Sequence, residues 1–239
     1  MSDDALSRTT APVGPRVNAS PAKRPGRTTL HGRQVTVTPL DPVAHGDALY
    51  EATRGEAGDQ LWLYLFEGPF LERAAFDLHL QRAAASEDPL FFAILDRASG
   101  NAAGYAAYMR VEPAHQVIEV GSILYTPRLQ RTILATEAMY LMARHVFEDL
   151  GYRRYEWKCN ALNAPSRKAA LRLGFTFEGI FRQHMIVKGR NRDTAWFSML
   201  DSEWPARKGN FERWLNASNF GPDGRQKIAL SALNVVAGA

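Results

Sequence analysis

A single carboxylate stands inside an apolar strand pattern near the middle of the chain. Glu119 lies between Ile118 and Val120, in a run typical of a half-buried strand. Partial burial raises the pKa of a carboxyl group, which suits Glu119 to accept a proton near neutral pH. An outward-facing glutamate with no chemical role is an equally weighted interpretation. His184 is the reserve base, although a lone histidine is more often a packed or edge residue.

A second candidate segment follows the same strand. Residues 127–136 begin with a proline and lead into an apolar helix pattern. A loop that opens a helix presents backbone N–H groups without helical partners at the positive end of the helix dipole. Such groups bind phosphate oxygens, so the segment is a candidate anion site. Any strand–loop–helix connection offers the same groups, and the signal alone is weak.

Further polar and aromatic residues could contact a ligand. Asn163 and Ser166 flank Pro165 at the start of a short predicted helix. Asn163 is either a helix N-cap or a side-chain amide that contacts a ligand, and one asparagine can serve both. Candidates for the wall of an acceptor site, which as an aromatic cluster would more often be core, are Trp62, Tyr64, Phe66 and Trp196.

These candidates must be positioned by a sheet with interleaved helices. Strand patterns occupy residues 34–38, 90–96, 104–111, 118–125, 153–160, 175–182 and 194–200. Helix patterns occupy residues 43–53, 70–85, 134–150 and 164–173. A polar turn at residues 188–193 separates the last two strands. Glu119 therefore lies on the fourth strand, and the candidate anion loop joins that strand to the third helix.

The chain is expected to form one domain with two extensions. Residues 1–30 combine four prolines with small and basic residues, which cannot bury enough apolar surface to offset ordering entropy, so they predict a flexible arm. Residues 31–205 contain all the predicted strands. Residues 206–239 predict a helical appendix, around residues 211–215, followed by a mobile tail.

Three blocks occur in an order and spacing that resemble one family. They are PRLQRTILATEA at 127–138, NAPS at 163–166 and LGFTFEG at 173–179. They resemble the GNAT acetyltransferases, in particular the branch that modifies ribosomal-protein N-termini, over residues 31–205. The resemblance implies an α/β (α+β) GNAT fold: a mixed, mostly antiparallel seven-stranded sheet, splayed between strands 4 and 5, with helices on both faces.

The same resemblance implies an acyltransferase for groups other than aminoacyl groups. It would move an acetyl group from acetyl-CoA, its co-substrate, to a primary amine by direct attack, the amine being a protein N-terminus or a small molecule. The pantetheine arm would lie in the splay, and Ser166 takes the position of the proposed general acid. The expected catalytic residues are Glu119, Ser166 and His184. The expected CoA-binding residues are Leu124, Gln130, Arg131, Thr132, Ile133, Leu134, Ala135, Thr136 and Asn163.

Two positions depart from the family pattern. Ile133 stands at the first glycine of the Gln/Arg-x-x-Gly-x-Gly/Ala pattern, and isoleucine disfavours a positive φ and keeps a ligand farther from the backbone. Ala170 stands where many members have a tyrosine suited to act as the acid. Both departures favour a rival function, a non-catalytic GNAT-like module that binds CoA or a peptide.

Composition and absent motifs narrow the remaining classes. The single cysteine, Cys159, excludes an internal disulfide framework and a C-x-x-C zinc spacing, so a reducing compartment and no metal are expected. No apolar run is long enough to span a bilayer, and the first residues lack a signal-peptide core, which predicts a cytoplasmic protein without a membrane partner. Hydrolase, P-loop and zincin motifs are absent from the sequence.

The basic residues of the chain raise the question of an acidic or nucleic-acid partner. The net charge of +4 is small and partly sits in residues 1–30, so no nucleic-acid partner is expected. The basic turn with Lys188, Arg190 and Arg192 could face an acidic acceptor or RNA, although such turns are more often solvated. The chain is expected to be a monomer or a homodimer.

Overall fold

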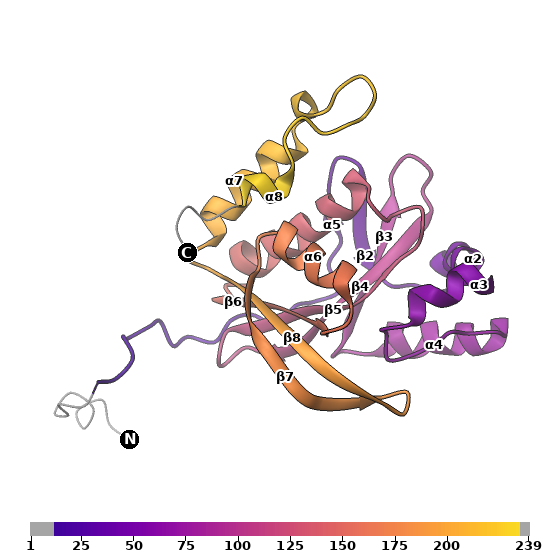
Figure 1. The fold of residues 1–239 in the computed structure, drawn as a ribbon, viewed down its shortest axis with the longest axis horizontal. Coiled ribbons are helices and arrows are strands. Elements are labelled where there is room, and N and C mark those ends of the chain that lie inside the picture. The colour runs from indigo at the N-terminus through magenta and orange to yellow at the C-terminus, as the bar shows by residue number, and fades with distance from the viewer. Residues whose placement is uncertain (1–11, 235–239) are drawn as a thin grey trace.

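The computed structural model describes residues 12–234 as an open β-sheet with helices packed against it (Figure 1). Its strands follow the order β1-β2-β3-β4-β5-β6-β8-β7. All seven predicted strands are present, and a two-residue edge strand adds the eighth. The strand bounds are β1 Leu30–His31, β2 Val35–Pro39, β3 Leu90–Asp96, β4 Ala102–Glu112, β5 Val117–Tyr125, β6 Arg154–Asn160, β7 Thr176–Val187 and β8 Arg190–Leu200.

Side chains cap the first turns of α2, α5 and α6. Asp41 caps α2, because its side chain accepts hydrogen bonds from the amides of Val43 and Ala44. The predicted helix at 134–150 is α5 continued by a π-helical turn, His145–Asp149, and the chain then turns at Gly151 with φ +77°. The helix bounds are α2 Pro42–Thr53, α3 Gly55–Asp59, α4 Arg73–Ala85, α5 Ile133–Arg144, α6 Ala164–Arg172, α7 Trp204–Leu215 and α8 Leu230–Leu233.

Alternating residues of the central strands face two separate apolar layers. Phe92 and Ile94 of β3 belong to the main core cluster, together with the buried residues of α5. Phe91 and Ala93 of the same strand belong to a second cluster with Phe76 of α4. The sheet is therefore covered by α5 on one face and by α2 and α4 on the other.

The sheet opens between β5 and β6, which are its parallel pair. Only Val117–Val120 of β5 pairs with β6, opposite residues 154–157, and both strands continue beyond this pairing. From Gly121 onward the edge of β5 is therefore not hydrogen-bonded to β6. This splay is the opening that the resemblance implied between the fourth and fifth predicted strands.

The β7–β8 hairpin is longer than the sequence pattern suggested. The predicted turn at residues 188–193 was wrong, because the turn comprises only Lys188 and Gly189 and both strands extend to it. A bulge between Phe181 and Met185 interrupts the alternation of β7, with Gln183 at φ +51°. The period-2 signal therefore stops at Arg182 although the strand does not.

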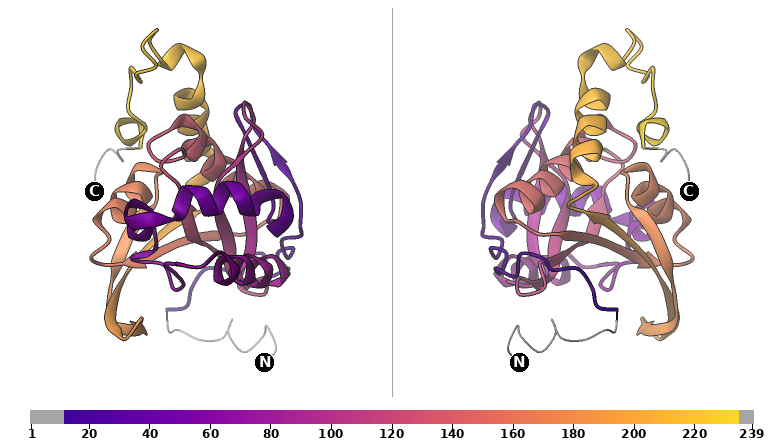
Figure 2. Two further views of the ribbon diagram at one scale, coloured as in Figure 1. Left: turned by 90° about the vertical axis from the view of Figure 1, so that its right-hand side faces the viewer. Right: turned by 90° about the vertical axis from the view of Figure 1, so that its left-hand side faces the viewer.

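Both chain extensions contact the domain where they are described. Residues 1–11 of the expected arm and 235–239 of the expected tail lie outside the described residues. In residues 12–29, the amides of Ala22 and Lys23 donate to Pro113 O and Leu150 O. The C-terminal helices rise beside α5, at the top of the views in Figure 2, and Asn234 Nδ2 donates to Arg172 O of α6 at 2.9 Å.

A buried glutamate joins α5 to the start of the sheet. The Glu137 carboxylate accepts hydrogen bonds from the amides of Arg33 at 2.7 Å, Gln34 at 2.8 Å and Val35 at 3.1 Å. Gly32 precedes them because a Cβ there would come within 2.8 Å of the same carboxylate carbon. One side chain thus satisfies three backbone donors that the short β1–β2 connection leaves without strand partners.

Replacing Glu137 should therefore destabilise the fold. We expect Glu137→Ala to lower the free energy of unfolding by about 2–4 kcal/mol, because it removes the acceptor of three partly buried donors. Urea denaturation would measure the change. The control Glu51→Ala removes an exposed carboxylate paired with Arg54 and should cost no more than about 0.5 kcal/mol. Equal losses in the two variants would contradict the assigned role.

Candidate functional site

The loop after β5 is held in one conformation by backbone and hydroxyl contacts. The amides of Leu129 and Gln130 both donate to Thr126 O, and Thr126 Oγ1 donates to Ala103 O at 2.6 Å. The left-handed residue of the loop is Arg131, with φ +60°. Thr132 then caps α5, because its Oγ1 accepts from the amide of Ala135 at 3.3 Å.

This cap leaves helix amides available at the loop. The N–H groups of Ile133 and Leu134 belong to the first turn of α5 and have no acceptor within the helix. Ile133 takes the first helical position, which requires no positive φ, and its partly buried side chain packs against the main core. The glycine of the family pattern is therefore not needed here for backbone conformation. The amides and the positive helix end suit an anionic ligand.

The remaining candidate CoA residues surround this loop. Leu124 is buried in the second core cluster, Gln130 Nε2 donates to Tyr125 O at 2.9 Å, and Thr136 Oγ1 accepts from Arg172 at 3.0 Å. Asn163 caps α6, because its Oδ1 accepts from the amide of Ser166 at 3.1 Å. The cap does not use Nδ2, which makes no hydrogen bond within the described part of the chain.

Ser166 faces β6 from the first turn of α6. Its Oγ accepts a hydrogen bond from Trp157 Nε1 at 3.0 Å. Burial raises the pKa of the Cys159 thiol, and the Ser166 hydroxyl opposes that effect through a side-chain hydrogen bond. Ser166 therefore has a fixed place next to β6, within the part of β6 that borders the splay.

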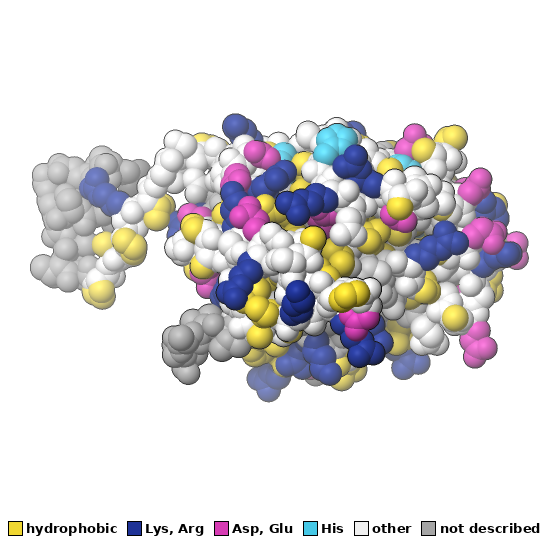
Figure 3. Space-filling view, turned by 90° about the horizontal axis from the view of Figure 1, so that it is seen from above, with side chains coloured by type: hydrophobic (Ala, Val, Ile, Leu, Met, Phe, Trp, Pro, Cys, Tyr) yellow, Lys and Arg dark blue, Asp and Glu magenta, His cyan; other side chains and the backbone are white. Residues whose placement is uncertain are grey.

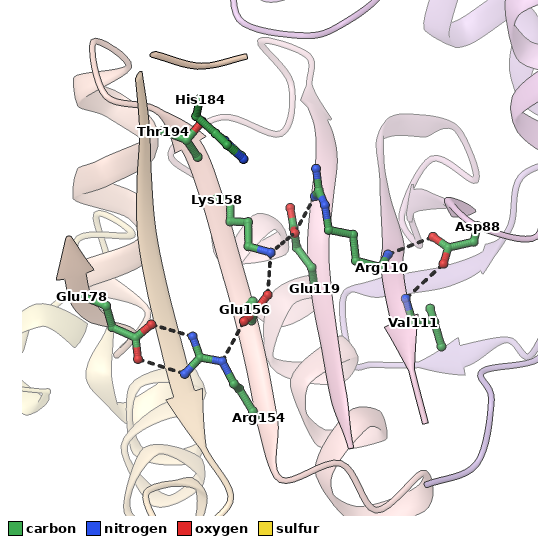
Figure 4. Close-up of polar contacts among 10 residues, drawn as sticks. All are labelled: Asp88, Arg110, Val111, Glu119, Arg154, Glu156, Lys158, Glu178, His184 and Thr194. Atoms are coloured by element: carbon green, nitrogen blue, oxygen red, sulfur yellow. Dashed lines mark hydrogen bonds and ion pairs between the residues drawn. The ribbon is translucent and has the colours of Figure 1, made fainter. Parts of the chain in front are cut away.

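Glu119 is the centre of a buried ion-pair group. Its Oε2 accepts from Arg110 Nη1 at 2.6 Å and lies 3.0 Å from Lys158 Nζ, and Lys158 Nζ is also 2.6 Å from Glu156 Oε2 (Figure 4). The side chains of Glu119 and Lys158 are only 3% and 4% exposed. Glu119 and Glu156 are register partners on β5 and β6, so Lys158 separates two carboxylates that would otherwise repel each other.

The chain of ion pairs continues toward β7. Arg154 Nε donates to Glu156 Oε1 at 2.7 Å, and its other nitrogens form a bidentate pair with Glu178, whose Oε1 also accepts from Ser198 Oγ. We call the group of Arg110, Glu119, Lys158, Glu156, Arg154 and Glu178 the ion-pair chain (Figure 4).

Within the ion-pair chain, Glu119 alone was a candidate site residue from its sequence context. The signal for three others was the alternation of Arg154, Glu156 and Lys158 along β6, which places them on one face. Arg110 had no such signal. It reaches Glu119 because a bulge gives it φ +49°, and Asp88 holds that bulge by accepting from the amides of Arg110 and Val111.

The pKa of Glu119 is raised by burial, although Lys158 and Arg110 both act in the opposite direction. Its second oxygen, Oε1, makes no hydrogen bond within residues 12–234. That oxygen lies near Gly121, since a Cβ built there would be 3.1 Å from it. Glu119 therefore combines a raised pKa with one unoccupied oxygen at the start of the splay, as a proton acceptor needs.

His184 lies on the exposed edge of β7. Its Nδ1 is 2.9 Å from Thr194 Oγ1, and its ring packs near Phe181 and Trp196. Its pKa is lowered, first by desolvation and then by the positive charges of Arg110, Arg192 and Lys158. His184 also lines an open hollow of about 840 Å³ beside the β7 bulge. The ion-pair chain does not line this hollow, so the hollow is not the centre of the charged site.

The four aromatic candidates have different surroundings. Trp62 is 1% exposed and packs in the second core cluster against Phe70 and Phe76. Tyr64 is tied to the loop before α6, because its hydroxyl donates to Leu162 O at 3.3 Å. Phe66 and Trp196 are less buried, and Lys158 Nζ lies 3.9 Å from the centre of the Trp196 ring. The structure thus brings Trp196, but not Trp62, to the ion-pair chain.

Within residues 12–234, no group of three or more His, Cys, Asp or Glu side chains is arranged to hold a metal ion. No helix in the same part of the chain is long and apolar enough to cross a membrane. On the face seen in Figure 3, basic side chains are interspersed with acidic and apolar ones.

Comparison with known proteins connects this geometry to a family. The family model described as an acetyltransferase (GNAT) domain matches residues 42–176. A GCN5-related N-acetyltransferase from Brucella melitensis is 52% identical, and the alignment covers 91% of this chain and 98% of that one with a TM-score of 0.88. A probable GNAT-family acetyltransferase from Chromobacterium violaceum is 41% identical, with coverages of 83% and 99% and a TM-score of 0.76.

A curated relative matches over a shorter stretch. The ribosomal-protein-serine acetyltransferase of Escherichia coli (strain K12) is 27% identical over 101 residues, which are 42% of this chain. The match covers 56% of the relative, so this chain aligns with little more than half of that protein's length.

Removing the cation at the centre of the ion-pair chain should destabilise the fold in a pH-dependent way. We expect Lys158→Met to cost about 3–5 kcal/mol, because it removes the cation between two adjacent buried carboxylates and leaves Glu119 paired with Arg110 alone and Glu156 with Arg154 alone. It also removes the largest effect that lowers the pKa of Glu119, so that pKa rises further. A carboxyl group whose pKa is raised in the folded state loses stability as pH rises, so the cost should be greater at pH 8 than at pH 5.

Urea denaturation at the two pH values checks this expectation. Lys168→Met, which removes an exposed lysine of α6, is the matched control and should change stability little at either pH. Combining Lys158→Met with Glu119→Gln should recover part of the loss at pH 8. A cost independent of pH and of the second substitution would show that Lys158 contributes by packing alone.

Proposed function

This chain belongs to the acetyltransferase (GNAT) family, and we propose that it is an N-acetyltransferase that transfers an acetyl group from acetyl-CoA to a primary amine by direct attack. The family match confirms the resemblance and the fold class expected from the sequence. The observation that supports the reaction best is the splay between β5 and β6, which lies between the capped start of α5 and the buried Glu119.

Residues of this chain suit the donor, acetyl-CoA, which supplies an acetyl group activated as a thioester. The free amides of Ile133 and Leu134 would bind its diphosphate at the positive end of α5. The edges of β5 and β6 beyond Val120 offer backbone groups along which the pantetheine arm can extend. Asn163 Nδ2, which the α6 cap does not use, is suited to contact the same arm.

Glu119 is the proposed general base. An amine attacks a thioester only in its neutral form, so a proton must leave it before or during attack. Glu119 Oε2 is held by Arg110 and Lys158, while Oε1 is free to accept that proton directly or through water. The raised pKa of Glu119 increases its affinity for the proton. His184, on the neighbouring hairpin, remains the reserve base.

We propose that Ser166 stabilises the leaving thiolate by a hydrogen bond. Its oxygen already accepts from Trp157 Nε1, which leaves its O–H to donate toward the splay or toward Cys159. Ala170, at the usual tyrosine position, is fully buried and has no donor to offer. The acid function at this site would therefore depend on Ser166 or on water.

The acceptor is proposed from the relatives and from the open side of the site. The Escherichia coli relative is named for a serine of a ribosomal protein, so a protein N-terminus is the first acceptor class to test, with small amines second. The cytoplasmic location and the choice between monomer and homodimer stay predictions. A thiol-release assay with acetyl-CoA and an amine panel tests transfer, and binding without release above buffer would favour the non-catalytic module.

Proline at Ile133 tests the donor site without breaking the helix. Thr132 already has an extended backbone that suits the residue before a proline, and the first helical position accepts proline. We expect Ile133→Pro to weaken acetyl-CoA binding by about 5- to 30-fold, because one amide donor is lost. Calorimetry measures this, with Ile133→Val as the control that keeps the amide. Unchanged affinity in the proline variant would place the diphosphate elsewhere.

Removing the proposed base should lower kcat more than it raises KM. We expect Glu119→Gln to reduce kcat by about 100-fold or more. Glu156→Gln is the matched control, because Glu156 pairs with the same Lys158 but faces Arg154, and its kcat should fall by no more than about tenfold. The acidic limb of the wild-type kcat profile should lie above the ordinary glutamate pKa of 4.5, in the direction of the Glu119 shift. Equal kcat values in the two variants would remove Glu119 as the base.

A further inference from the structure

Arg192 is a buried cation without a partner. It lies on β8 and is 7% exposed, and its side chain makes no hydrogen bond or ion pair within the described residues. Its Nε is fully buried and has no acceptor. Its guanidinium makes a cation–π contact instead, because the guanidinium carbon lies 5.0 Å from the centre of the Phe66 ring. A desolvated guanidinium with no acceptor is costly, and such a group is kept where it serves a ligand.

The neighbouring charges do not supply the missing anion. Glu119, Glu156 and Glu178 are each within 3.0 Å of a nitrogen of Arg110, Lys158 or Arg154, as described for the ion-pair chain. Those three carboxylates balance those three cations, and Arg192 is the fourth cation. Among these seven side chains, the cations therefore outnumber the carboxylates by one. A single carboxylate matches that deficit, whereas a phosphate would carry nearly two.

The position of Arg192 is on the acceptor side of the proposed site. Arg192, Thr194 and Trp196 alternate on one face of β8, and Trp196 is the register partner of Lys158 on β6. The groups that act electrostatically on Arg192 are Cys159 first, and then Glu119 and Arg110. The proposed diphosphate contacts lie instead at the start of α5. An anion bound to Arg192 would thus be close to the proposed base and away from the diphosphate loop.

The segment that carries Phe66 packs against Arg192. Lys188 Nζ donates to Trp62 O at 2.7 Å and to Glu67 O at 3.0 Å, so the hairpin turn is tied to the segment that carries Phe66. Phe66 is thereby held against the Arg192 guanidinium, whose terminal nitrogens, unlike Nε, are not fully buried. A guanidinium can bind a carboxylate through two parallel hydrogen bonds while one of its faces packs on an aromatic ring.

The three basic residues of the hairpin therefore differ in role. Lys188 fixes the loop, Arg190 is exposed, and Arg192 is buried without a partner. We propose that Arg192 binds a carboxylate carried by the acceptor, so that the preferred substrate is an amine with a carboxylate group, such as an amino acid or an acidic peptide N-terminus. This inference rests on the proposed acetyl transfer.

Matched acceptor pairs test the proposal. The probes are glycine against glycinamide, and the peptide amides Ser-Asp-Ala against Ser-Asn-Ala, each assayed by thiol release from acetyl-CoA. We expect Arg192→Met to raise KM for the carboxylate member of the preferred pair by about 10- to 100-fold and to change KM for its amide partner less than about twofold. Arg192→Lys should restore part of the difference. Arg190→Met, which removes an exposed arginine of the same strand, should leave both values unchanged.

Two outcomes would overturn the carboxylate site. One is an equal change in both members of each pair, which would make Arg192 a structural residue. The other is a loss in Arg192→Met that appears only with succinyl-CoA as donor, which would assign the carboxylate to the acyl group. Thermal unfolding without substrate adds a separate readout, because removing an unpaired buried charge should raise Tm, and a fall in Tm would contradict the unpaired state.

A binding measurement separates this inference from the proposed function. Calorimetry with N-acetylglycine, which carries the carboxylate and cannot be acetylated again on a primary amine, should show binding to the wild type and at least a tenfold loss in Arg192→Met. If no amine is acetylated but this difference holds, the carboxylate site stands and the transferase function fails. If transfer occurs and N-acetylglycine binds both proteins equally, the carboxylate site fails alone.

Discussion

The short parallel pairing of β5 and β6 is the constraint on which the rest of the site depends. Four register pairs hold the strands together, and at one of them two glutamates stand side by side. Lys158 lies between these carboxylates and makes the pairing tolerable. Beyond it the strands separate, which frees their edges and leaves Gly121 beside the Glu119 carboxylate. The splay and the charged residues at its start thus both follow from the short pairing of β5 with β6.

The two faces of the sheet differ in polarity. The face under α5 is apolar along β1 to β6 and along β8, and it provides most of the core. The opposite face is apolar only under α2 and α4, and it becomes charged along β6 and β8. Burying that charge is costly, and each of the six groups in the ion-pair chain reduces the cost for its neighbours. Arg192 is the exception, and it lies where a substrate would bring the compensating group.

Sequence patterns were sufficient to place the seven longer strands, the start of α5 and the position of Glu119 within β5, because these depend on local periodicity and on residues adjacent in the chain. Patterns failed where a bulge changed the period, as at residues 181–185, and where a positive φ turned Arg110 toward a neighbouring strand. The burial of Trp62 and of Arg192 was also not predictable from local patterns. Trp62 packs against Phe76 of α4 and is contacted by Lys188 of the distant hairpin, and Arg192 packs against Phe66 of the segment before α4. The departure at Ile133 has a local explanation, since the left-handed residue of the loop is Arg131.

The contact between the C-terminal extension and α6 has a thermodynamic consequence. Asn234 holds the Arg172 carbonyl, and the Arg172 guanidinium holds Thr136 in the first turn of α5. The last described residues and the mouth of the anion loop are therefore joined through one arginine. The coupling free energy between two sites is the same in both directions. If docking of the extension increases the affinity for a ligand, the bound ligand must therefore stabilise the docked extension by the same free energy, against fraying and proteolysis.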